Sequence, residues 1–157
     1  MKKLRLATVP SSNCWQKDLQ RLVSDFALPS SMARHFSELK CWQLSRSLQR
    51  EVFQLLKRAV FASNPKARDN LNDAASSARR NIAEGFGRRG HKEFARFLNI
   101  SLSSLKEVED GLIECVDNEW LTEKETAAAR MLCKRATVAA SRLRNSIKDK
   151  PDPPECA

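Results

Sequence analysis

The segment from Asn81 to Gly90 reads NIAEGFGRRG, and it contains G-F-G-R-R-G, a formal match to the G-x-G-x-x-G pattern of phosphate-binding loops. A dinucleotide site of this kind needs a β-strand that leads into the first glycine, within a βαβ unit. Here helical sequence precedes Gly85, and no candidate parallel strand occurs in the chain. We therefore predict a turn between two helices, with Gly85 one residue past the first helix in the left-handed conformation that commonly ends a helix.

Residues suited to catalysis or metal binding are few and scattered. The two histidines, His35 and His91, stand at predicted helix starts without an evident carboxylate or serine constellation. The chain has no H-E-x-x-H motif and no pair of Glu-x-x-His motifs of the kind that di-iron bundles use. Glu84 and Glu107 are candidates for partly inward-facing carboxylates, which a buried salt bridge or a helix cap explains better than a metal. We expect no catalytic residues, no metal, no cofactor and no enzymatic activity.

Positive charge is the main chemical feature of the 157-residue chain, which has a net charge of +9 and a pI near 9.7. Such an excess favours polyanionic partners. Residues 79–96 carry six basic residues against two carboxylates, and residues 130–150 carry seven against one. Residues 106–125 carry eight carboxylates against two lysines. If successive helices alternate in direction, both basic stretches lie at one end of the molecule and the acidic stretch lies at the other.

The elements that must position these charges are helices, because helix-forming residues dominate while glycine is scarce and tyrosine is missing. Apolar residues recur at helical spacing in four stretches, each on the order of 20 to 28 residues long. Helices joined by short turns bury such stripes against one another, so we predict an all-α fold, an antiparallel up-down four-helix bundle over residues 36–149. Residues 1–35 are predicted to be an N-terminal extension with a short amphipathic helix, and residues 150–157 a disordered tail.

Cap residues indicate where three of the helices begin. Ser37 is the predicted cap of the first helix, with Phe36 packing onto Cys41. The pair Asn64-Pro65 opens the second helix, with asparagine as the cap and proline at the first helical position. The segment Thr122-Glu-Lys-Glu125 is a capping box for the fourth. The predicted inner faces are Trp42, Ser45, Leu48, Val52, Leu55 and Ala59; Leu71, Ala74, Ala75, Ala78 and Ile82; Phe94, Leu98, Ser101, Leu105, Val108, Leu112 and Cys115; and Leu132, Ala136, Ala139, Leu143 and Ile147.

Five scattered cysteines without a C-x-x-C pair indicate reduced thiols in a cytosolic protein. At the N-terminus, Arg5 interrupts the apolar run and Pro10 ends it too early for a signal peptide. No stretch approaches the length of a transmembrane helix. We expect a cytoplasmic protein with no membrane partner.

The hairpin around Gly85 also carries a family resemblance. NIAEGFGRR, followed by Lys92-Glu-Phe-x-Arg-Phe-Leu98 and Ser101-Leu-Ser-Ser-Leu-x-Glu107, resembles the core signature of a four-helix bundle family. That family includes proteins encoded in intervening sequences of bacterial large-subunit ribosomal RNA genes, and the accessory variability determinant of diversity-generating retroelements is a relative. The opening motif Phe36-x-x-Leu-x-x-Trp-Gln43 is also similar, and the resemblance covers about residues 36–148.

The resemblance implies a homo-oligomer, with a pentamer favoured, that binds RNA or DNA and has a reverse transcriptase as a partner. One departure is visible in the second helix. Where the family reads Arg-Arg-Ala-Ala and then proline, this chain has Asn72-Asp-Ala-Ala75 and Arg79, so it lacks the residue for a proline kink. The apolar residues that lie off the main stripes and offer surface to neighbouring subunits are Leu44, Phe53, Phe97, Ile100 and Ile113.

Two hypotheses about function remain open. The first is a non-catalytic basic adaptor that binds the nucleic acid backbone electrostatically, with little base stacking because few exposed aromatic residues are expected. By the resemblance, it would serve as an accessory protein of a reverse transcriptase in a diversity-generating retroelement. The alternative is a protein–protein interaction module without physiological nucleic acid binding. The predicted nucleic-acid-binding residues are Arg79, Arg80, Arg88, Arg89, Lys92, Arg142, Arg144 and Lys148.

Overall fold

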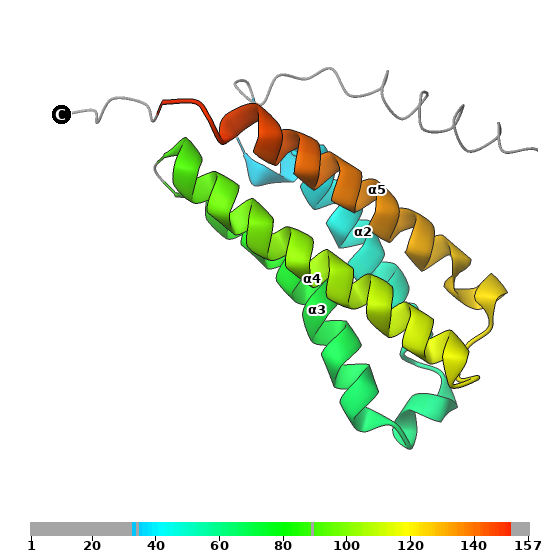
Figure 1. The fold of residues 1–157 in the computed structure, drawn as a ribbon. Helices are drawn as coiled ribbons and strands as arrows, with labels where there is room; N and C mark the ends of the chain where they lie inside the picture. Colours follow the sequence, from blue (N-terminus) through cyan, green and yellow to red (C-terminus); the bar gives the residue numbers. More distant parts are fainter. Residues whose placement is uncertain (1–32, 34, 89, 152–157) are drawn as a thin grey trace, which may run out of the picture. The chain divides into compact units, whose positions relative to one another are not determined.

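The computed structural model describes residues 33, 35–88 and 90–151, and its elements are all helical. Each of the four long helices packs against two neighbours, in the cyclic order α2, α3, α4 and α5, and successive helices run in opposite directions (Figure 1). This arrangement confirms the predicted antiparallel four-helix bundle. None of the described helices is long and apolar enough to cross a membrane. The elements are η1 (Phe36–Glu38), α2 (Lys40–Leu55), η2 (Ala59–Ala62), α3 (Pro65–Phe86), α4 (His91–Asp117) and α5 (Glu123–Ile147).

The first long helix begins later and ends earlier than its sequence predicted. Ser37 does not cap it: this residue lies in the short 3-10 helix η1, whose N-cap His35 accepts a hydrogen bond at Nδ1 from the Ser37 backbone N–H. Helix α2 starts after Leu39, which makes no side-chain cap bond. The ring of Phe36 packs edge-on against Trp42, with centroids 5.1 Å apart.

Helix α2 is 16 residues long, so it is shorter than predicted. Because it ends at Leu55, the inner stripe is not continued by Ala59, which is exposed in η2. Leu44 is only 8% exposed within the single chain, so its prediction as spare apolar surface is wrong. The chain then enters α3 with Pro65 in the first turn, as predicted, but the Asn64 side chain donates to the Val60 carbonyl and does not cap α3.

The α3–α4 hairpin confirms a helix-to-helix turn but corrects the role of its first glycine. Helix α3 continues through Gly85 to Phe86, and the glycine with positive φ is Gly90 (φ 121°), at the N-cap of α4. Gly85 is buried, and a Cβ added to it would lie 2.5 Å from the Cβ of Phe97. Glycine is therefore needed here because the two helices approach closely, and not because the chain turns left-handed.

The predicted inner faces of α3 and α4 are confirmed. The small residues of α3 are all buried, and every predicted α4 position except the half-buried Phe94 is buried as well. The buried hydroxyl of Ser101 donates a hydrogen bond to the Ala78 carbonyl at 2.8 Å, which joins the two helices. On α5, Leu132 is half-buried, whereas the other four predicted positions are buried.

Three cysteines of the bundle are free and buried, as expected for reduced thiols. Burial raises the pKa of the Cys41 thiol to about 12, and that of the Cys115 and Cys133 thiols to about 11. Such thiols stay protonated near neutral pH and act as small apolar core residues. Cys14 and Cys156 lie outside the described residues, as do the predicted helix of the N-terminal extension and most of the predicted tail.

Candidate nucleic-acid interface

The turn between α3 and α4 lies at the same end of the bundle as the C-terminus of α5. The Nδ1 atom of His91, the first residue of α4, is 2.7 Å from the carbonyl oxygen of Pro151. On the next turns of the two helices, Arg144 donates from Nη1 to Asn99 Oδ1 at 3.0 Å. The structure therefore brings together four of the predicted residues, which we call the basic pole: Arg88, Lys92, Arg144 and Lys148.

Local contacts orient two side chains of the basic pole, Arg88 and Lys148. Arg88 forms a 2.5 Å ion pair with Glu84, one turn back on α3, and its guanidinium carbon lies 5.1 Å from the ring centroid of Phe97. Lys148 is 3.7 Å from the neighbouring Asp149 carboxylate. Both basic side chains remain about half exposed. Exposed ion pairs of this kind contribute little free energy, so a phosphate can displace them readily.

Two other predicted residues do not join the basic pole. Arg79 is half-buried, and its Nε donates to Gln49 Oε1 at 2.7 Å across the contact between α2 and α3. Arg80 lies in an open groove between α3 and α4, where Asp73 and Asp110 are among the lining residues. Both arginines precede the end of α3 by six or seven residues, or roughly 10 Å along the helix axis.

The remaining two predicted residues are placed differently. Arg142 is half-buried on α5, five residues before the helix ends. Arg89 lies outside the described residues.

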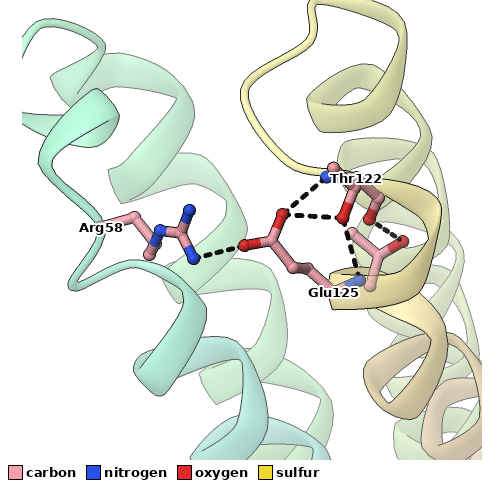
Figure 2. A network of polar contacts seen from close by, with 4 residues as sticks. Arg58, Thr122 and Glu125 are labelled. Carbon is pink, nitrogen blue, oxygen red and sulfur yellow. Dashed lines mark hydrogen bonds and ion pairs between the residues drawn. The ribbon is translucent and has the colours of Figure 1, made fainter.

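The opposite end of the bundle is less acidic than its sequence predicted. The segment 106–125 does lie there in part, but Arg58 reaches from the end of α2 to the carboxylate of Glu125 at the start of α5 (Figure 2). Arg130, which the charge count assigned to the basic end, pairs with Glu123 at 3.2 Å instead. Arg130 lies in the first turns of α5, and these turns are at the end of the bundle where α4 ends.

Glu125 itself is fixed by the predicted capping box, which the structure confirms. Its Oε2 accepts hydrogen bonds from the Thr122 backbone N–H and hydroxyl at 2.9 and 2.8 Å, while the Thr122 Oγ1 accepts from the Glu125 backbone N–H (Figure 2). These bonds from Thr122, and then the charge of Arg58, lower the pKa of the Glu125 carboxyl. The arrangement anchors the start of α5 against the segment that follows α2.

Basic residues of α2 were missed by the prediction, which considered only the ends of the bundle. Arg46 and Arg50 lie on the exposed face of α2, and Lys57 follows shortly after the helix ends. Phe53 stands among them with 54% of its surface exposed. The spacing of Arg46, Arg50 and Phe53 by four and three residues was the available signal, because it places these three on one side of a helix.

The carboxylates that were expected to face inward do not. Glu84 and Glu107 are both exposed, and Glu84 pairs with Arg88. Within the described ranges, no three His, Cys, Asp or Glu side chains are grouped so that they could hold a metal ion.

The chain is similar to one protein family in sequence and to a solved structure in fold. A family model described as "23S rRNA-intervening sequence protein" matches residues 37–140. A solved structure of a protein of unknown function from the S23 ribosomal protein family, from Bacteroides thetaiotaomicron, is similar with a TM-score of 0.58 at 18% identity. That similarity covers 70% of this chain and 99% of the other, and at this identity it supports the fold alone. No curated protein matches the chain.

Proposed function

Because the chain belongs to the 23S rRNA-intervening sequence protein family, we propose that it is a non-catalytic adaptor that binds the phosphate backbone of RNA or DNA through the basic pole. The observation that carries the proposal is the convergence of Arg88, Lys92 and Lys148 from three segments of the chain on one end of the bundle. Guanidinium and ammonium groups are the donors that proteins use for phosphate oxygens. The family description, which refers to ribosomal RNA, agrees with a nucleic-acid-associated role.

The proposal includes self-association, with a pentamer favoured by the sequence resemblance. Two exposed apolar side chains of α4, Ile100 and Ile113, support an interface between copies. In a closed ring, equivalent basic poles would act together on one polyanion, which raises the overall affinity by effective concentration. A reverse transcriptase of a diversity-generating retroelement, as a protein partner in the cytoplasm, is proposed from the sequence resemblance alone.

A protein–protein interaction module remains the second candidate, because the same exposed apolar side chains fit a protein partner. The two functions differ in what the basic pole does. In the adaptor it contacts phosphates, whereas in an interaction module its charge is incidental.

The test compares two triple variants of the full chain that lose the same charge at opposite ends. Arg88→Gln, Lys92→Gln and Lys148→Gln remove three of the four cations of the basic pole. Lys66→Gln, Arg68→Gln and Lys124→Gln remove exposed cations near the starts of α3 and α5. The ends are roughly 40 Å apart along α4, several times the screening length of about 8 Å at physiological salt. We expect the pole variant to bind labelled RNA and DNA oligonucleotides on the order of tenfold more weakly, and the control to bind like the wild type. Equal affinities for the two triple variants would reject the proposal.

A further inference from the structure

The exposed face of α2 combines cations with an exposed aromatic ring. Arg46, Arg50 and Phe53 follow one another at intervals of four and three residues, and Lys57 comes four residues later. At 100° per residue, Arg46, Arg50 and Phe53 fall on one narrow stripe of α2. Lys57 lies two residues past the end of the helix, and its ammonium is 5.2 Å from the Phe53 ring centroid. All four residues are exposed. We call them the α2 strip.

Acidic residues are scarce on the helix that carries the α2 strip. The other exposed residues of α2 are Lys40, Gln43, Ser47 and Gln54, and the single acidic residue of the helix, Glu51, is half-buried. In the part of the chain that the structure describes, Arg46 and Arg50 form no ion pair, unlike Arg58, Arg68, Arg88, Arg96 and Arg130. The strip therefore presents unneutralised positive charge to solvent.

Aromatic rings hold two of these cations in place. The Arg46 guanidinium carbon lies 5.7 Å from the ring centroid of Trp42, and the Lys57 ammonium lies 5.2 Å from that of Phe53. Lys57 also donates to Gln54 Oε1 at 3.0 Å. Contacts of this kind pre-arrange a cation beside a ring. A polynucleotide offers both partners that such a surface requires, since it has phosphates for the cations and flat base faces for the ring.

We propose that the α2 strip binds single-stranded nucleic acid, with a base stacked on Phe53 and phosphates held by Arg46, Arg50 and Lys57. The inference rests on the proposed function, and it adds a second surface and a strand preference to it. A single strand is favoured because its bases are open for stacking on a side chain, whereas in a duplex their faces are covered by neighbouring base pairs. From Arg46 to Phe53 the helical part of the strip is about 10 Å long, enough for on the order of three stacked nucleotides.

The experiment measures the affinity of the full-length protein for a labelled single-stranded oligonucleotide and for a duplex of the same length. Phe53→Leu keeps an apolar side chain but removes the aromatic face, so we expect about tenfold weaker binding of the single strand and less than about twofold change for the duplex. Met131→Leu, at another exposed apolar position on α5, is the matched control and should change neither affinity. Phe53→Trp should restore single-strand binding, and its added fluorescence should be quenched when the base stacks.

Comparing Phe53→Leu with the basic-pole triple variant separates this inference from the proposed function. If the basic-pole variant weakens binding of both substrates while Phe53→Leu binds like the wild type, the pole remains the site and the α2 strip is rejected. If Phe53→Leu alone loses single-strand binding, the strip stands and the pole loses its role. If Phe53→Leu lowers the mass measured by light scattering and weakens both substrates equally, Phe53 is a subunit contact and the inference is wrong. If the wild-type protein binds neither substrate, both proposals fail.

Discussion

Gly85 on α3 and Phe97 on α4 approach so closely that a Cβ on the glycine would lie 2.5 Å from the Cβ of the phenylalanine and 2.9 Å from Cδ2 of Phe94. A side-chain rotation cannot relieve the contact with Phe97, because its Cβ is bonded directly to the backbone. The close approach of the two helices next to the basic pole therefore depends on this glycine. The same contact positions Phe97, over whose ring Arg88 lies.

The substitution Gly85→Ala should destabilise the bundle by about 1–3 kcal/mol, the usual cost of overpacking a core. Gly87→Ala is the matched control: a Cβ there meets only ordinary contacts, the nearest at 3.5 Å, and its φ of −78° suits any residue. Alanine at Gly87 should be neutral or slightly stabilising. Urea unfolding followed by circular dichroism measures both changes. A Gly85→Ala protein as stable as the wild type would show that the helices are not held at this distance.

The capping box predicts a pH-dependent contribution to stability. Hydrogen bonds from Thr122 to Glu125, with the charge of Arg58, lower the carboxyl pKa in the folded protein. Its contribution is therefore present above the unfolded value of about 4.3 and is lost as the pH falls through the folded pKa. Glutamine can still serve in a capping box, so Glu125→Gln removes mainly the charge.

We expect Glu125→Gln to lower the Tm at about pH 7, and the difference from the wild type to shrink as the pH falls below about 4.3 and through the lowered folded pKa of the carboxyl. Glu123→Gln serves as a control, because Glu123 has an exposed ion pair with Arg130 and no capping bond from its carboxylate. Thermal unfolding at a series of pH values measures the effect. A Tm difference that stays constant down to the lowest pH would mean that the charge of Glu125 has no stabilising role.

Assembly is predicted from the exposed apolar residues of α4. The wild-type protein should show a mass several times 17.8 kDa by light scattering, and five copies are favoured. Ile100→Asp with Ile113→Asp places charge in an apolar interface and should shift the protein toward the monomer. Asn70→Asp adds charge at an exposed polar position of α3 and should leave the mass unchanged. A wild-type protein that is strictly monomeric at micromolar concentration would contradict this prediction.

The sequence predicted the bundle well because its apolar spacing is unambiguous where helices are long. The stripe from Leu98 to Cys115 and the capping box at Thr122 each have one reasonable structural interpretation, and both are observed. Gly85 was misread because glycine near a helix end serves equally for a left-handed turn and for a close helix contact. Only the position of Phe97 on the next helix distinguishes the two roles.

The charged surface was harder to predict, because charge counts along the chain do not say which end or face a residue occupies. Arg130 belongs to the end opposite the one to which the count assigned it, since it pairs with Glu123. Arg79 is directed to Gln49 by the packing of α2 on α3. Arg46 and Arg50 were overlooked because α2 carries no dense run of charge, and their shared face becomes evident once the exposed side of the helix is known.

The salt dependence of nucleic acid binding tests the central claim most directly. Each phosphate contact contributes about 0.7 to 0.9 to the slope of log affinity against log salt concentration. The variant with Arg88→Gln, Lys92→Gln and Lys148→Gln should therefore show a slope shallower than that of the wild type by about two to three, whereas the charge-matched Lys66→Gln, Arg68→Gln and Lys124→Gln variant should keep the wild-type slope. Identical slopes for the wild type and both variants would contradict phosphate binding by the basic pole.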